Sequence, residues 1–215
     1  MENSLQKAIQ TALDDAPERK FIESLEMSIT LKDVDLKNPT NRIQEEVRLP
    51  SGRGKEVKIA MFAGGEMAAK ARAAGLEIID PSTIEDLGSK RQTARKMANN
   101  FDFFLSEISH MGTVGRFLGV VLGPRGKMPR PVPPPVDPAM IAGGLKDTAI
   151  VRSRDKITFH MAIGSRSQST EELTANALAI WKRVMGRLDR GPSNIRSCYI
   201  KTSMGPAVRV EVANS

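Results

Sequence analysis

Residues 197–209 read SCYIKTSMGPAVR, and this stretch indicates how the ends of the chain fold. Apolar and polar side chains alternate in it: Cys198 and Ile200 fall on one face, and Tyr199 and Lys201 fall on the other. Alternation of period two, interrupted by a Gly-Pro pair, predicts two strands joined as a β-hairpin. The polar face combines hydroxyl groups with cations. These groups suit either a solvated surface or contacts to phosphate and sugar oxygens.

Three other segments at the two ends of the chain show related patterns. Residues 24–31 alternate four polar with four apolar side chains, residues 157–163 repeat this alternation, and residues 43–49 mark a further strand. A Ser-x-x-Glu capping box at Ser169 predicts the start of a long helix with one apolar stripe. Half-buried strands with amphipathic helices predict a sheet that is covered on one face.

The middle of the chain has a different pattern. Residues 57–63 are almost continuously apolar and are followed by Gly-Gly, an alanine-rich helix and a short apolar strand at 76–79. This order predicts a β-α-β unit with a parallel sheet. A second capping box at Ser82 predicts another helix, residues 101–108 a third strand, and residues 149–151 a fourth strand of this small sheet.

Composition narrows the classes of function. The 215 residues carry a net charge of +7, which favours a polyanionic partner. No apolar run is long enough to span a bilayer and the N-terminus is acidic, so we expect neither a membrane protein nor a signal peptide. The single cysteine excludes an internal disulfide and favours the cytoplasm. Only 4% of residues are aromatic, so an RNA partner would be recognised by shape and backbone rather than by stacking.

Residues 122–131, LGPRGKMPRP, form a second unusual stretch. The Gly-Lys pair is reminiscent of a phosphate-binding loop, but Val121 and Met128 occupy the places of its first glycine and its Ser or Thr. The prolines predict a stiff segment that presents Arg125, Lys127 and Arg130, either as a secondary RNA contact or as a plain surface loop.

Signals for catalysis or metal binding are weak. Gly64-Gly65 lacks the spacing of a dinucleotide-binding loop, and neither a nucleophile elbow nor a Cys-His signature is present. No cysteine or carboxylate lies at metal-ligand spacing from His160, so we expect no metal and no cofactor. An enzyme that binds a nucleotide or small molecule in the middle domain remains the alternative, supported by fold analogy alone, and a nonspecific basic RNA chaperone is a third possibility.

Residues 122–131 and the TSMGP run at 202–206 together resemble the universal ribosomal protein L1 family in its archaeal form, and the likeness covers almost the whole chain. The resemblance implies a two-domain α/β fold of the α+β kind. Residues 1–57 and 153–215 would form a bipartite RNA-binding domain with a split β-α-β antiparallel sheet. Residues 58–152 would form an inserted Rossmann-like domain with a parallel sheet. The change from alternating to continuous apolar strands agrees with this layout.

The resemblance also implies a function. The protein would belong to the 50S ribosomal subunit, bind the L1 stalk of 23S rRNA near the exit (E) site for deacylated tRNA, and assist release of that tRNA. It would repress translation of its own mRNA, have no enzymatic activity, and be monomeric when free. The implied RNA contacts are Phe21, Ser24, Glu26, Ser28, Thr30, Gly164, Arg166, Ser197, Thr202, Ser203, Met204, Gly205 and Pro206.

Some residues depart from the family pattern. Ser203 stands where threonine is usual, which keeps the hydroxyl group, and Ser165 stands where lysine is frequent, so that Arg166 would have to replace its charge. The prolines at 133–135 are an unusually rich run. Glu26 would read RNA by accepting from a ribose 2′-hydroxyl or a guanine amino group, because a carboxylate repels phosphates.

Overall fold

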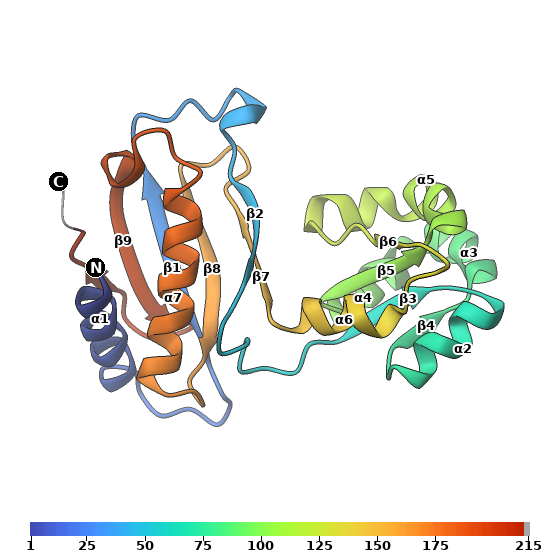
Figure 1. Cartoon of the computed structure of the whole chain (residues 1–215), viewed down its shortest axis with the longest axis horizontal. Coiled ribbons are helices and arrows are strands. Elements are labelled where there is room, and N and C mark those ends of the chain that lie inside the picture. The colour runs from blue at the N-terminus through green and yellow to red at the C-terminus, as the bar shows by residue number, and fades with distance from the viewer. Residues whose placement is uncertain (213–215) are drawn as a thin grey trace. The chain divides into compact units, whose positions relative to one another are not determined.

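The computed structural model describes residues 1–212, which form two compact units (Figure 1). Unit 1 consists of Met1–Lys55 and the residues from Asp147 onward, and unit 2 is the insertion Glu56–Lys146. Each unit has its own hydrophobic core. The chain crosses between the units twice, and the first crossing, at Lys55–Glu56, lies close to the position expected after residue 57. The second lies at Lys146–Asp147, several residues before the position expected from the sequence.

Unit 1 is built on four antiparallel strands in the order β10-β9-β1-β8. Their bounds are β1 (Ser24–Leu31), β8 (Thr158–Ser165), β9 (Ile195–Thr202) and β10 (Val208–Val210). Along β1 every second residue is buried, which confirms the alternation predicted from the sequence. The predicted hairpin is also confirmed, because β10 pairs with β9 across the Gly-Pro turn.

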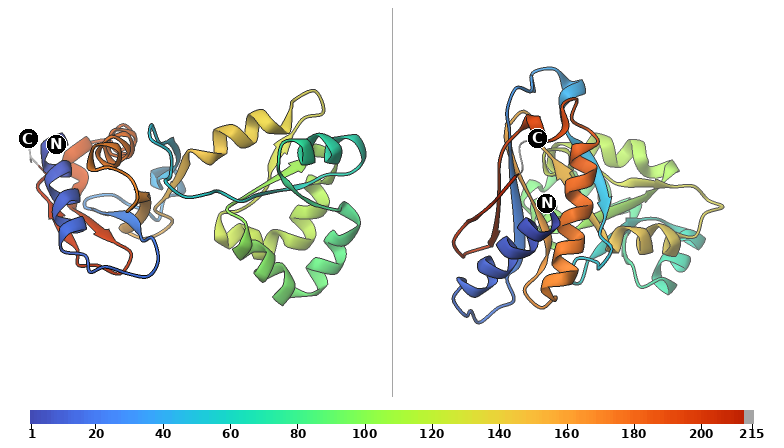
Figure 2. Two further views of the ribbon diagram at one scale, coloured as in Figure 1. Left: turned by 90° about the horizontal axis from the view of Figure 1, so that it is seen from below. Right: turned by 60° about the vertical axis from the view of Figure 1, so that its left-hand side comes forward.

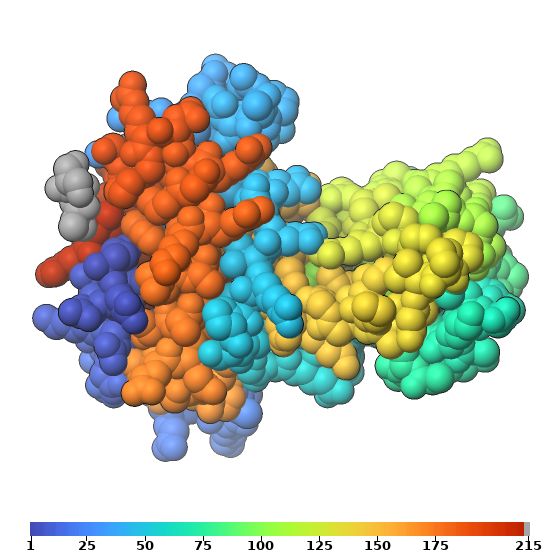
Figure 3. All heavy atoms as spheres, in the orientation of Figure 1, coloured from blue at the N-terminus to red at the C-terminus, as the bar shows by residue number. Residues whose placement is uncertain are grey.

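Helices α1 (Glu2–Asp14) and α7 (Thr170–Met185) cover one face of this sheet (Figures 1 and 2). In Figure 3 their side chains hide that face from view. The predicted capping box begins α7: the Ser169 hydroxyl accepts from the Glu172 N–H, and the Glu172 carboxylate accepts from the Ser169 N–H. The apolar stripes of both helices pack on the buried side of the strands, so the opposite face of the sheet keeps its polar side chains.

Strand β7 (Thr148–Arg152) corrects one prediction. It pairs antiparallel with β2 (Gln44–Arg48) in unit 1, instead of forming the fourth strand of the middle sheet. Val47 and Val151, one from each strand, belong to the core of unit 1. The short apolar run of β7 suits either sheet. For this reason the pattern assigned β7 to the middle domain and predicted the second crossing after residue 152 instead of at Lys146–Asp147.

Unit 2 contains a parallel sheet in the order β4-β3-β5-β6. Its strands are β3 (Ile59–Phe62), β4 (Glu77–Ile79), β5 (Phe103–Glu107) and β6 (Arg130–Val132). Its helices are α2 (Gly65–Ala73), α3 (Ile84–Ser89), α4 (Arg91–Asn100), α5 (Ile108–Arg125) and α6 (Pro138–Lys146). The predicted β-α-β order is present, and all four residues of β3 are buried, as the continuous apolar pattern indicated.

Two local predictions in unit 2 are wrong. Ser82 does not cap α3; it lies in a short 3-10 helix and donates its hydroxyl to Asp80 at 2.7 Å. Residues 122–125 are not a loop, because α5 includes Pro124 and ends only at Gly126, whose φ of 70° is left-handed. None of the helices in the described part of the chain has the length and apolarity needed to cross a bilayer.

Two buried or partly buried amides fix the loop that leads from β8 to α7, residues 164–168. Gln168 accepts from the Ser165 N–H at 3.0 Å and donates to the Ser51 carbonyl at 2.8 Å. Asn176 accepts from the Ser51 N–H at 3.0 Å and donates to the Gly52 carbonyl at 2.9 Å. These bonds fix loop 164–168 against the segment that precedes the first crossing.

Candidate nucleic-acid interface

The face of the unit 1 sheet opposite α1 and α7, here called the outer face, is lined with polar side chains. It is formed by Ser24, Glu26, Ser28 and Thr30 of β1, Thr158 and His160 of β8, and Ser197, Tyr199 and Lys201 of β9. The register places Lys201 beside Glu26, and Tyr199 beside Ser28. The Thr30 and Thr158 hydroxyls lie 3.1 Å apart. The four expected contacts on β1 therefore share one surface with Ser197.

The turn at residues 203–206 lies at one end of the outer face. Ser203 anchors it to β1: its N–H donates to the Ser24 carbonyl at 3.0 Å, and its hydroxyl donates to Glu26 Oε1 at 3.1 Å. Met204 is 58% exposed although it is apolar, and Pro206 is exposed beside it. The turn thus presents a methionine, a proline and partly accessible backbone next to the carboxylate of Glu26.

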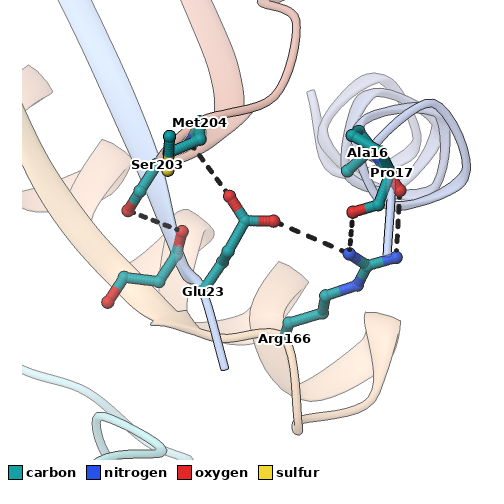
Figure 4. A network of polar contacts seen from close by, with 7 residues as sticks. Ala16, Pro17, Glu23, Arg166, Ser203 and Met204 are labelled. Carbon is teal, nitrogen blue, oxygen red and sulfur yellow. Dashed lines mark hydrogen bonds and ion pairs between the residues drawn. The ribbon is translucent and has the colours of Figure 1, made fainter. Parts of the chain in front are cut away.

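Glu23 is a site residue that the sequence analysis missed. It is 1% exposed, and its Oε1 accepts from the Met204 N–H at 2.9 Å (Figure 4). Its Oε2 lies 3.6 Å from Nη1 of Arg166. One signal was present in the sequence: Glu23 precedes Leu25 by two positions, so it continues the buried face of β1, where an acidic side chain needs a partner.

Two exposed apolar side chains lie in the segment that precedes Glu23 and β1. Phe21 is 54% exposed and Ile22 is 70% exposed, in the segment that connects α1 to β1. They border a surface hollow lined by Glu18, Arg19, Lys20, Phe21, Ile22, Arg166 and Ser167. Exposed apolar groups beside cations can contact sugars and base edges as well as phosphates.

Thr202 is an expected contact that does not lie on the surface, and Gly205 is only partly exposed. The Thr202 side chain is fully buried, because it lies on the same face of β9 as Cys198 and Ile200, so its expected place on the outer face is corrected. A Cβ atom on Gly205 would collide with Thr202 Oγ1 and lie 3.3 Å from the Ala16 methyl group. Glycine at 205 is therefore required by the packing of the protein itself.

Gly164 is also buried. A Cβ atom there would collide with Gln168 and with Leu173, so the position needs glycine for the close packing of loop 164–168 on α7. Gly164 thus supports the loop that carries Arg166 and presents no surface of its own. The structure brings Phe21, Arg166 and the turn at 203–206 together at the end of β1 where Ser24 and Glu26 lie.

The three cations expected to form a secondary RNA contact have partners within unit 2. Lys127 Nζ donates to the carbonyls of Ala98 and Phe101 at 2.8 and 2.7 Å, at the end of α4. Arg125 donates to the Val121 carbonyl at 3.0 Å, and the Arg130 guanidinium lies 5.9 Å from the centre of the Phe103 ring. All three side chains thus have contacts within unit 2, which the proline-rich sequence did not indicate.

Within residues 1–212 no group of three His, Cys, Asp or Glu side chains is placed to hold a metal ion. Cys198 is buried, and this burial raises the pKa of its thiol to about 12. The thiol is therefore neutral at physiological pH and behaves as an apolar core group.

Comparison with known proteins identifies the family. Residues 9–206 match the Ribosomal protein L1p/L10e family. The large ribosomal subunit protein uL1 of Thermoplasma volcanium is 45% identical, over 97% of this chain and 96% of the relative. The uL1 proteins of Picrophilus torridus and Methanocorpusculum labreanum are 46% and 47% identical, over 96% and 94% of this chain and 96% and 95% of the relatives. The chain therefore belongs to the ribosomal protein L1 family.

Proposed function

We propose that the protein is a component of the large ribosomal subunit that binds rRNA through the outer face of unit 1 and the turn at 203–206. One observation carries the proposal: the Ser203 hydroxyl joins the turn to Glu26, so that an exposed Met204 and the polar side chains of β1 form one continuous surface. Hydroxyls, a carboxylate and accessible backbone are the groups that recognise a structured RNA by its shape and its 2′-hydroxyls.

The chemistry of the surface supports recognition of shape. Tyr199 is the only tyrosine of the chain and shares the outer face with one other ring side chain, His160, so stacking of several bases has little platform there. Glu26 keeps the role of accepting from a 2′-hydroxyl or a guanine amino group, and Lys201 beside it in the register supplies a cation for phosphate. Arg196 and Arg209 line a further hollow at the edge of this face.

The finer assignments follow from family membership and remain part of the proposal. The RNA is the L1 stalk of 23S rRNA near the exit site for deacylated tRNA, and the protein assists release of that tRNA. Its own mRNA is a second target, through a structure that mimics the rRNA site. The relatives carry the names of ribosomal proteins, and the alternative of an enzyme in unit 2 rests on fold analogy, from its β-α-β order and its Gly-rich turn.

Binding to an RNA fragment of the stalk tests the proposal. The affinity is measured over a range of salt concentrations against a scrambled duplex of equal length, because the phosphate contribution is common to both RNAs and falls with salt. The proposal predicts a preference for the stalk fragment that persists at high salt. Equal affinities for the stalk fragment and the scrambled duplex at every salt concentration would show that the protein binds polyanions without specificity.

Competition between the two RNAs tests regulation. Feedback requires one surface for both RNAs and stronger binding to rRNA, and a difference of about 1.4 kcal/mol gives a tenfold preference. We expect the rRNA fragment to displace the mRNA fragment completely. Equal affinities, or simultaneous binding of both RNAs to one molecule, would rule out this feedback.

A further inference from the structure

The contacts of Arg166 determine its role at the interface. Its Nη1 donates to the Pro17 carbonyl at 2.9 Å, and its Nη2 donates to the Ala16 carbonyl at 3.1 Å. The same Nη1 lies 3.6 Å from Glu23 Oε2, and the side chain is 29% exposed. Figure 4 shows the guanidinium directed at these partners of the protein itself. Each terminal nitrogen thus has at least one partner within the fold.

Glu23 joins this arginine to the turn. Its Oε1 accepts from the Met204 N–H at 2.9 Å, and its backbone carbonyl accepts from the Arg166 N–H at 2.9 Å. Ala16, whose carbonyl accepts from Arg166, also places its methyl group directly beside Gly205. Three segments that are distant in sequence meet here. They are the connection from α1 to β1 (residues 16–23), loop 164–168 and the turn at 203–206.

A fully buried carboxylate is unfavourable unless it is paired, and such a pair is a poor source of net stability compared with apolar packing. The pair is better suited to holding a defined geometry, because the planar guanidinium donates to two carbonyls and lies at ion-pair distance from the Glu23 carboxylate. We propose that Glu23 and Arg166 are positioning residues for RNA binding, which hold Met204 and Phe21 in the arrangement that the RNA contacts, and that Arg166 is not a phosphate contact. This inference rests on the proposed function.

Arg166→Lys distinguishes the two roles. Lysine keeps the positive charge, so a direct phosphate contact would largely survive, whereas a single ammonium group cannot hold both carbonyls in the same way. We expect Arg166→Lys to lower affinity for the stalk RNA fragment about tenfold, with an unchanged dependence on salt. Arg91→Lys, the same change on exposed α4, is the matched control and should leave affinity unaltered.

The salt dependence provides a second readout. Replacing a phosphate contact reduces the slope of log K against log salt by about one. Lys201→Ala on the outer face should show this reduction, whereas Arg166→Gln should lower affinity at every salt concentration with the slope of the wild type. Glu23→Gln should behave like Arg166→Gln. The double variant should lose less than the two single losses combined, because both residues act in one network.

The outcomes separate clearly when affinity is measured at a temperature where melting curves show each variant to be folded. Unchanged affinity of Arg166→Lys and Glu23→Gln would overturn the positioning role. A slope reduced by about one in Arg166→Gln would identify a phosphate contact and overturn it as well. In both cases the proposed function still holds if the wild-type protein prefers the stalk fragment over the scrambled duplex. A wild type without that preference would overturn the proposed function together with this inference.

Discussion

The two units use polar residues in opposite ways. In unit 1, helices α1 and α7 cover one face of the sheet, and the polar side chains of β1 and β9 on the other face are accessible as a set. In unit 2 the strands β3 and β5 are almost entirely buried, and Lys127 and Arg125 satisfy carbonyls at helix ends. Net charge alone therefore does not indicate which unit carries a binding surface, whereas the set of polar side chains that the unit 1 sheet leaves accessible does.

Met204→Asp should have the largest effect. The substitution replaces an exposed apolar contact with a carboxylate that repels phosphates, and we expect affinity for the stalk RNA fragment to fall about thirtyfold or more. Met140 on α6 is 77% exposed and provides the matched control in unit 2. Met140→Asp should leave affinity unchanged within about twofold. Equal losses for the two variants, measured by filter binding, would remove the distinction between the units.

Lys127→Met tests the other side of the comparison. The change removes the donors to the Ala98 and Phe101 carbonyls, and we expect it to lower the free energy of unfolding of unit 2 by about 1–3 kcal/mol. RNA affinity of the folded protein should stay within about twofold of the wild type. Urea unfolding and RNA binding are measured on the same samples. Unchanged stability with a large loss of affinity would instead make Lys127 an RNA contact.

A smaller effect should distinguish the two faces of β9. Burial raises the pKa of the Cys198 thiol to about 12, so the folded protein keeps it neutral while the unfolded chain ionises it at lower pH. Its contribution to stability is complete below about pH 9 and is lost as pH rises towards 12. We expect iodoacetamide to label native Cys198 at pH 8 at least about tenfold more slowly than the urea-unfolded chain. Equal rates, followed by mass spectrometry, would place Cys198 on an accessible face.

Much of unit 1 could be predicted because alternation is a local property. The pattern at 24–31 identified β1 and its exposed residues, and the pattern at 197–209 identified the hairpin. The same alternation, extended to positions 23 and 202, places Glu23 and Thr202 on the buried face, so their burial also follows from the local pattern.

Other features depend on contacts between distant segments. The apolar run at 148–152 indicates a strand but does not select its partner, and β7 pairs with β2 from about a hundred residues earlier. Lys127 bonds to the end of α4 only because α4 and α5 pack together. Arg166 was expected to contact RNA in place of a lysine, and its partners at Ala16 and Pro17 are 150 and 149 residues away. Side-chain partners at such separations leave no local signal.

Removal of unit 2 tests the central claim most directly. The Leu49 N–H donates to the Asp147 carbonyl at 2.8 Å, so the two chain segments at the crossings lie side by side and a short Gly-Ser linker can replace Glu56–Lys146. Unit 1 keeps its own core, and we expect the shortened protein to bind the stalk RNA fragment within about tenfold of the full chain. It should retain the preference over a scrambled duplex of equal length. A shortened protein that is folded by circular dichroism and shows no such preference would contradict the claim that unit 1 carries RNA recognition.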